Sequence, residues 1–321
     1  MKVLKERRRF LRTALRCAGV SAISAALPVW PRTAPAQTER APIGAHALRG
    51  NLFQMSGAGG NIVLLRDPAG GVMVDSGAAE TASAVGGLVS SRLDGVPLGH
   101  LFNTHWHLEH TGGNEAIGRT AAAIVAHENT RLWMSTEYHV DWENRTYAPR
   151  TAAALPTKTF YSHEKQPLVL EVGAERIEYG HLREAHTDGD IYIFFREHNV
   201  LAAGGVVAAG AYPILDYATG GWIGGLMDAT EKLLAITDAS TLIVPAAGPA
   251  QPRSHLTTQH EMVATVRGRI EDLMRKGKSA DEMIAAGVTR EFDALFGANS
   301  ERFVRNVYGG LWWQGRLNGS L

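Results

Sequence analysis

A run of ten residues from His105 to Asn114, HWHLEHTGGN, constrains the fold of this chain more than any other feature. Three histidines and a glutamate fall within its first six residues, which is too dense for ordinary packing. Residues i and i+2 of an extended segment point to the same side, so the rings of His105 and His107 can converge on one ion. Gly112 and Gly113 let the backbone turn sharply and approach other segments closely. The run therefore predicts a metal site at the end of a strand.

Short apolar segments on either side of this run predict two strand-rich halves. In the first half we expect two hairpin strands, a helix, and a strand that leads into the histidine run, over residues 61–66, 71–75, 80–93 and 100–104. In the second half we expect five strands, over residues 168–170, 176–179, 191–195, 200–203 and 241–244. We also expect a helix over residues 223–237, before the last of these strands. Such an order indicates two sheets packed face to face with helices outside.

The C-terminal region has a helical pattern. Apolar residues recur at helical spacing from Met262 to Met274, and Gly277 ends this run. Ser279 followed by Glu282 is typical of a capping box that starts another helix. Because no repeat or long linker interrupts the chain after residue 45, we expect one domain over residues 37–321, with a core at about 50–250 and a helical extension at 256–321.

Four features, taken in chain order, resemble the metallo-β-lactamase fold superfamily, whose members are chiefly hydrolases that hold one or two zinc ions between two β-sheets. They are the early hairpin, the Asp-containing loop VDSG, the histidine run and the segment AHTDGD, at residues 61–74, 74–77, 103–114 and 185–190. The resemblance covers roughly residues 50–248. It implies an α+β fold, the four-layer αβ/βα metallo-β-lactamase sandwich, here with additional C-terminal helices.

Carried over onto this chain, the resemblance makes His105, His107 and His186 a complete three-histidine zinc site. Three neutral imidazoles with an open fourth position form a catalytic zinc arrangement. A zinc ion held in this way lowers the pKa of its bound water to about 7. The resemblance thus implies a zinc-dependent hydrolase.

The family's second metal site is where this chain departs from the pattern. Glu109 stands where the family usually has Asp, Gly205 stands in place of a later Asp ligand, and Ala247 stands in place of the last histidine. This leaves Glu109 and His110 as the candidate ligands of a second ion. Since stable zinc sites use three or four protein ligands, we expect one zinc per chain.

Two acids are the candidate catalytic groups, Glu109 and Asp75. Glu109 is interpreted either as a general base beside the metal-bound water or as an acceptor that orients a ligand histidine. Asp75 is expected to act by orienting a ligand, and Asp188 has the same interpretation.

Other residues near these motifs keep two interpretations each. His255 follows the altered turn closely, and a solvated loop histidine is favoured over a replacement ligand. His181 is left unassigned. Trp106 either lines the substrate pocket or packs beneath the loop. The pocket itself is expected between residues 136–156 and the loop around 212–222.

The N-terminus is predicted to be an export signal, residues 1–36. A basic start leads into an apolar stretch and then Ala34-Pro35-Ala36, a small-x-small cleavage signal. The run RRRFLR at residues 7–12 resembles the twin-arginine motif, with a general secretory signal or a membrane anchor as the alternatives. Arg16 interrupts the apolar run too early for a membrane span and precedes Cys17 where a lipoprotein site needs a small residue. We therefore expect a periplasmic or secreted protein without a membrane anchor.

Charge and cysteine content narrow the function. The first 36 residues hold eight Lys or Arg and one Glu, so the 24 basic and 31 acidic residues after them give a net charge of about −7. This balance argues against nucleic acid or anionic lipid as a partner. The only cysteine lies in the signal, so metal ligands must be nitrogen or oxygen.

We therefore expect an exported mono-zinc hydrolase that uses zinc-bound water on a small-molecule ester, lactone, thioester or amide. The alternatives are a non-catalytic descendant that binds a metal or ligand, and an accessory protein of a periplasmic redox or quinoprotein system. A true β-lactamase is not favoured, and the oligomeric state is open.

Overall fold

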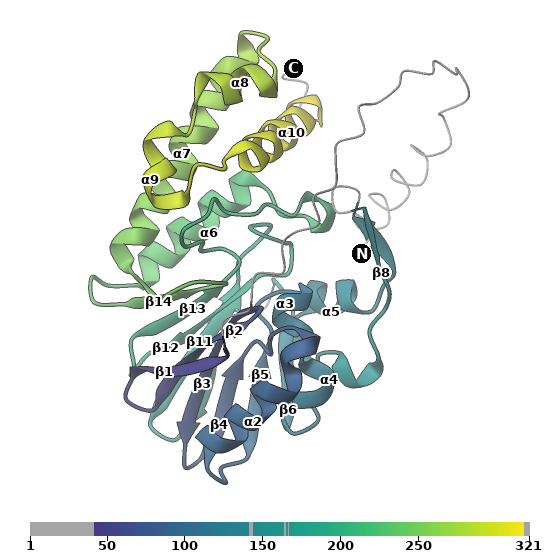
Figure 1. The fold of residues 1–321 in the computed structure, drawn as a ribbon, viewed down its shortest axis with the longest axis vertical. Coiled ribbons are helices and arrows are strands. Elements are labelled where there is room, and N and C mark those ends of the chain that lie inside the picture. Colours follow the sequence, from purple (N-terminus) through teal and green to yellow (C-terminus); the bar gives the residue numbers. More distant parts are fainter. Residues whose placement is uncertain (1–41, 141–143, 164, 166, 318–321) are drawn as a thin grey trace. The chain divides into compact units, whose positions relative to one another are not determined.

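A computed structural model describes residues 42–140, 144–163, 165 and 167–317 of the chain (Figure 1). The predicted export signal, residues 1–36, lies outside the described residues. Among the described residues, no helix combines the length and the apolar character needed to cross a membrane.

The first sheet has seven strands in the order β1-β2-β3-β4-β5-β6-β9. The pairs from β1 to β4 are antiparallel, whereas those from β4 through β5 and β6 to β9 are parallel. The strands are β1 (Gly44–Arg49), β2 (Leu52–Ala58), β3 (Gly60–Asp67), β4 (Gly70–Val74), β5 (Leu98–Phe102), β6 (Ala123–His127) and β9 (Lys158–Phe160).

The second sheet has six strands in the order β10-β11-β12-β13-β14-β15. Only β13 and β14 pair in parallel. The strands are β10 (Leu168–Val172), β11 (Glu175–His181), β12 (Ile191–Phe195), β13 (Val200–Gly204), β14 (Leu242–Pro245) and β15 (Gln251–Pro252). A separate antiparallel pair, β7 (Tyr138–Val140) with β8 (Arg145–Tyr147), lies within residues 136–156, which were expected to form part of the pocket.

Helices cover the outer face of each sheet (Figure 1). On the first sheet these are η1 (Ala79–Thr81), α2 (Ala82–Leu93), α3 (Leu108–Thr111), α4 (Asn114–Ile117), α5 (Glu128–Met134) and η3 (Ala152–Ala154). Those that follow the second sheet's strands are η4 (Tyr217–Thr219), α6 (Ile223–Ile236), α7 (Arg253–Arg275), α8 (Ala280–Ala286), η5 (Arg290–Phe292), α9 (Asp293–Phe296) and α10 (Glu301–Leu317).

The strand sequences explain the layers. In β3, Val63 and Leu65 join the core between the two sheets, whereas Ile62 and Leu64 join the core beneath α2. In β12, Ile193 faces the inter-sheet core, while its neighbours belong to the core beneath α6 and α7. Successive side chains of a strand point to opposite faces, so strands buried on both faces read as continuous apolar runs. The four-layer αβ/βα arrangement with additional C-terminal helices is confirmed.

The C-terminal helices follow their predicted signals. The helix α7 ends at Arg275, just before Gly277, whose φ is +72°. The Ser279 side chain accepts from the Glu282 amide, and the Glu282 side chain accepts from the Ser279 amide, so the predicted capping box is formed. The predicted strand over residues 100–104 is shifted, because β5 ends at Phe102 and Asn103 and Thr104 follow it.

Candidate metal centre

The histidine run lies where β5 ends and α3 begins. Its glycines are required by close approach. A Cβ on Gly112 would lie 2.4 Å from the Ala79 amide nitrogen, and one on Gly113 would lie 2.3 Å from the Ser76 carbonyl oxygen. The predicted close backbone approach is confirmed, and it fixes the loop against the segment that follows β4.

Three ring nitrogens converge in this region. Candidate ligand atoms of His105, His107 and His186 lie within 4.8 Å of one another, and all three residues are buried. His107 Nδ1 lies 3.0 Å from His186 Nε2. His105 Nε2 is buried and has no hydrogen-bond partner among the described residues. The structure thus brings together the three histidines that the sequence predicted as zinc ligands.

Two of these rings have their outward nitrogens fixed by acceptors. His107 Nε2 donates to Asp216 Oδ2 at 3.1 Å, and His186 Nδ1 donates to the Ile214 carbonyl at 2.7 Å. A neutral imidazole that carries its proton on one nitrogen presents a lone pair on the other. His107 Nδ1 and His186 Nε2 therefore face each other as lone pairs, an arrangement that a cation between them would stabilise.

The third ring is fixed through a longer chain of hydrogen bonds. Thr104 Oγ1 donates to Asp75 Oδ2 at 2.7 Å, so it accepts from His105 Nδ1 at 3.0 Å. His105 Nε2 is then also a lone pair that faces inward. Outer partners of this kind orient the ligands of a metal, and the donor set fits zinc.

Burial keeps the rings of His105 and His186 in the neutral form that binds metal. Burial, together with the neighbouring imidazoles, holds the pKa of His105 well below its usual range and lowers the pKa of His186 to about 3. Both rings are therefore neutral near pH 7.

His186 is placed by its own loop. The carboxylate of Asp190 accepts from the His186 amide at 2.6 Å, from the Thr187 amide at 2.8 Å and from the Thr187 hydroxyl at 2.7 Å. Gly221 leaves room for this loop, because a Cβ there would lie 2.0 Å from the His186 carbonyl oxygen. Asp190 was not singled out from the sequence, although it lies in the same motif.

The two candidate acids, Glu109 and Asp75, differ in burial and in the residues that they contact. Glu109 is half exposed, and its Oε1 lies 3.9 Å from His107 Nδ1. Although burial opposes its ionisation, the neighbouring imidazoles of His107 and His110 lower the pKa of Glu109. Asp75 is buried and accepts from Thr104 and from His110 Nδ1 at 2.8 Å. Asp75 therefore contacts the side chains of Thr104 and His110, and its role in orienting a metal ligand stays a prediction.

His110 is not brought into the ligand cluster. Among the described residues, the one group that could hold a metal consists of the other three histidines. The His110 ring packs against His105 with their centroids 4.4 Å apart, and it binds Asp75.

Within the part of the chain that the structure describes, neither Gly205 nor Ala247 has a replacement ligand beside it. A Cβ on Gly205 would lie 2.1 Å from His186 Cδ2, so the ring fills the space that a side chain would need. Ala247 lies exposed in a turn that is held by Asn61, whose Nδ2 donates to the carbonyls of Pro245 and Gly248 at 2.9 and 2.8 Å.

The interpretation of His255 as a solvated loop residue is wrong. The helix α7 begins at Arg253, so His255 lies in its first turn, buried, with Nε2 2.6 Å from the Ala208 carbonyl oxygen. Asp188 does not orient a ligand ring either, since its Oδ1 accepts from Trp133 Nε1 at 2.7 Å.

Trp106 packs beneath the loop and is 1% exposed. Its Nε1 donates to Thr219 Oγ1 at 3.0 Å, and its ring meets those of His107, Tyr138 and Tyr147 at centroid distances of 4.3, 5.1 and 5.0 Å. The segments expected to form the pocket therefore contribute an aromatic group behind His107.

Asp216 is the functional residue that sequence reasoning missed. It is buried and accepts from His107 and, at 2.6 Å, from Thr219 Oγ1. The signal was weak, a single acid in the apolar segment AYPILDYATGGW.

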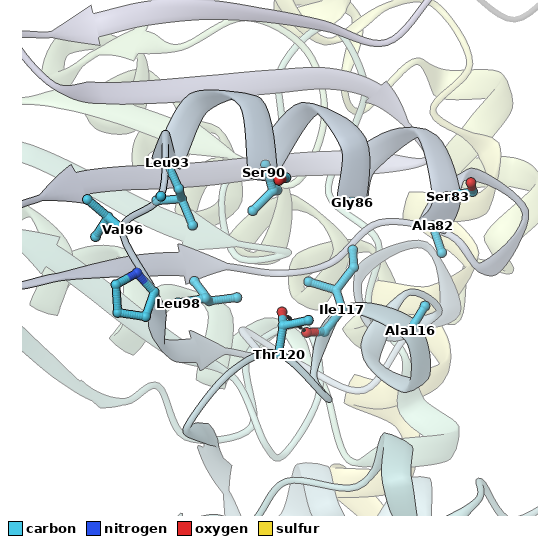
Figure 2. A pocket seen from close by; sticks show the side chains of 13 residues that line it. Ala82, Ser83, Gly86, Ser90, Leu93, Val96, Leu98, Ala116, Ile117 and Thr120 are labelled. Atoms are coloured by element: carbon cyan, nitrogen blue, oxygen red, sulfur yellow. Dashed lines mark hydrogen bonds between the residues drawn. The ribbon is translucent and has the colours of Figure 1, made fainter.

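A cavity of about 430 Å³ lies away from this centre, between α2 and α4 (Figure 2). Small and apolar residues line it, among them Gly86, Ser90, Ile117 and Thr120. None of the three histidines lines this cavity.

Comparisons with known proteins agree with this geometry. The chain is similar to the metallo-beta-lactamase from Pontibacter korlensis, with 17% identity over 69% of this chain and 99% of that one and a TM-score of 0.54. It is similar to the sec-alkylsulfatase Pisa1 from Pseudomonas sp., with 19% identity over 83% of this chain and 50% of that one and a TM-score of 0.62. The BLEG-1 B3 metallo-beta-lactamase shares 19% identity over 64% of this chain and 94% of that one, with a TM-score of 0.53. No curated protein matches.

At these identities the structural likenesses show the fold. The sequence match is to the family as a whole, and it covers residues 56–258, more than half of the chain. This match includes all three histidines and both altered positions, Gly205 and Ala247. The chain therefore belongs to the metallo-beta-lactamase superfamily.

Proposed function

We propose that this protein is an exported zinc-dependent hydrolase that holds one zinc ion on His105, His107 and His186. The observation that carries the proposal is the set of three inward lone pairs, one of them without any partner. Two nitrogens that each lie about 2.0–2.1 Å from a tetrahedral ion are separated by roughly 3.3 Å. The 3.0 Å separation of His107 Nδ1 and His186 Nε2 is close to this value.

The bound zinc would act as a Lewis acid and activate water near neutral pH. Glu109 is the residue of this chain that can accept a proton beside the open side of the cluster. Its carboxylate is half exposed, its lowered pKa keeps it ionised, and its Oε1 lies 3.9 Å from a ligand nitrogen. The Trp106 ring packs against the His107 ring and is itself covered by the rings of Tyr138 and Tyr147.

A single ion is proposed because the second site has too few ligands and because a protein side chain occupies part of its space. Gly205 and Ala247 offer no donor, and the His186 ring fills the space beside Gly205. Two remaining residues, Glu109 and His110, are fewer than stable zinc sites use.

The substrate proposed is an ester, lactone, thioester or amide. The likeness to an alkylsulfatase adds sulfate esters to the compounds worth testing. The signal at residues 1–36 supports a periplasmic location, with no anchor after cleavage behind Ala36.

Metal content tests the proposal directly. The chain from residue 37 onward, purified without chelator, should hold about one zinc, and His105→Ala should abolish both the zinc and hydrolysis across an ester, lactone, amide and sulfate-ester panel. His46→Ala, which removes an exposed histidine of β1, is the matched control and should change neither. A wild-type protein without zinc would refute the proposal.

A non-catalytic descendant is the second candidate, and the loss of two family ligands favours it. It predicts the same zinc content, with compounds that raise the melting temperature and are never converted. Turnover of any panel member that depends on His105 would exclude it.

A further inference from the structure

Three polar side chains that the metal centre does not use meet at the ends of three strands. His127 is the last residue of β6, His181 is the last residue of β11, and Ser162 follows the end of β9 by two residues. The two imidazole rings stack with their centroids 3.8 Å apart and their planes 9° apart. Ser162 Oγ lies 3.0 Å from one nitrogen of each ring. These residues form the Ser162 cluster.

Backbone groups fix the protons in this cluster. His127 Nδ1 accepts from the Asn129 amide at 3.2 Å, so its proton is on Nε2, which donates to Ser162 Oγ. His181 Nε2 lies 2.9 Å from the Asp188 carbonyl oxygen and must carry its proton there. His181 Nδ1 is then an acceptor, and the Ser162 hydroxyl donates to it.

This order of groups is that of an activated nucleophile. A hydroxyl donates to an imidazole, and a third group orients that imidazole from its far side. Access also fits, because Ser162 is exposed while both rings are buried. The neighbouring residue Tyr161 is 46% exposed, and its ring stacks on that of His163 at a centroid distance of 5.4 Å.

We propose that Ser162 is a nucleophile that accepts acyl groups from small esters, with His181 as its base. Ser162 Oγ forms a bond to the acyl carbon, and its proton passes to His181 Nδ1. The bond to the ester's alcohol oxygen breaks, and the alcohol leaves with that proton. The hydrogen bond from His127 Nε2–H positions Ser162 Oγ for the attack. Water then releases the acid and restores the hydroxyl.

Burial keeps both imidazoles of the cluster unprotonated. Burial, helped by the nearby cations of Lys232 and Arg183, lowers the pKa of His181 to about 4, against the hydrogen bond to Asp188. Burial and His181 lower the pKa of His127 to about 3. Both rings are neutral above about pH 5, so the acceptor at Nδ1 persists over a wide range.

A fluorophosphonate reporter tests the assignment without a known substrate. The Ser162 oxygen should attack phosphorus, fluoride should leave, and the proton should pass through His181 to solvent. On the zinc-loaded chain from residue 37 onward, peptide mapping should find the label on Ser162. The rate should be constant from pH 8 to about pH 5 and should fall towards pH 4, near the pKa of His181.

Variants separate the cluster from the metal centre. Ser162→Ala removes only an exposed hydroxyl and should abolish the label, while His181→Gln should slow labelling of Ser162 roughly 100-fold, the lower range for loss of a general base. Ser135→Ala, at an exposed serine whose hydroxyl donates to the Leu132 carbonyl, should label like the wild type. His105→Ala should also label normally, because this cluster uses none of the zinc ligands.

Two results would overturn the proposal. One is a wild-type protein whose Ser162 labels no faster than Ser135. The other is a folded His181→Gln, checked by its melting temperature, that labels at the wild-type rate. Neither result bears on the zinc site, whose own test is metal content.

Discussion

Gly205→Ala tests whether the His186 ring can bind zinc only while residue 205 has no side chain. A Cβ at this position would lie 2.1 Å from His186 Cδ2, 2.6 Å from Cγ and 2.7 Å from Nε2. To reach an ordinary contact of about 3.4 Å, the ring must move by about 1.3 Å. Metal–ligand distances tolerate only about 0.2 Å, so the variant must lose His186 as a ligand.

The expected effect is large. Loss of a residue that only orients a ligand lowers metal affinity about 10–100-fold, and loss of a ligand should exceed this range. We therefore expect Gly205→Ala to weaken zinc binding more than about 100-fold, or about 2.7 kcal/mol. The hydrogen bond from His186 Nδ1 to the Ile214 carbonyl would break as well, since it holds the ring at 2.7 Å.

Competition with a chromophoric chelator measures this affinity. Gly86→Ala is the matched control, because a Cβ there has no neighbour within 4 Å and the site lies in α2. Gly205→Asp is the sharper variant, since it restores the carboxylate that the family carries. We expect it to bind less zinc than the wild type. Two zinc ions per chain with undiminished affinity would refute the steric argument.

Three further predictions follow from single contacts. Asp216→Asn removes the negative charge that accepts the hydrogen bond from His107 Nε2 at 3.1 Å. It should weaken zinc binding about 10–100-fold in the same competition assay. Asp228→Asn, in α6, is the control. The pKa of His181 is about 4 in the folded chain and about 6.5 in the unfolded chain. Its neutral ring therefore contributes roughly 3 kcal/mol to the free energy of unfolding above pH 6.5, and this contribution is lost as the pH falls towards 4. Urea unfolding at pH 7 and pH 5 should therefore show a smaller pH dependence in His181→Gln. Asn114→Ala removes the buried hydrogen-bond partner of the Asn103 side chain and of the Ala154 carbonyl. It should lower the free energy of unfolding by roughly 3 kcal/mol. A loss below about 1 kcal/mol would contradict these hydrogen bonds.

Local motifs account for the part of the fold and site that the sequence predicts. The spacing of two residues between His105 and His107 predicts that their rings converge, and the structure brings them together although both residues lie beyond the end of β5. The layers follow from alternation in strands such as β3, and the start of α8 follows from Ser279 and Glu282.

Long-range partners could not be predicted in this way. Asp216 meets His107 across 109 residues, and only the folding of the loop before α6 brings them together. His255 was misplaced because α7 starts earlier than its apolar pattern indicated, with Arg253 directly after Pro252. The Ser162 cluster joins β6, β9 and β11, which pair in two different sheets.

Asp75 connects the rest of the histidine run to His105. Its Oδ2 accepts both the Thr104 hydroxyl and His110 Nδ1, so one oxygen joins His110 to the chain of bonds that orients His105. The His110 ring also packs on the His105 ring and fills the space beside Gly60, where a Cβ would lie 2.4 Å from His110 Cε1. His110 therefore serves the first site by packing and hydrogen bonding.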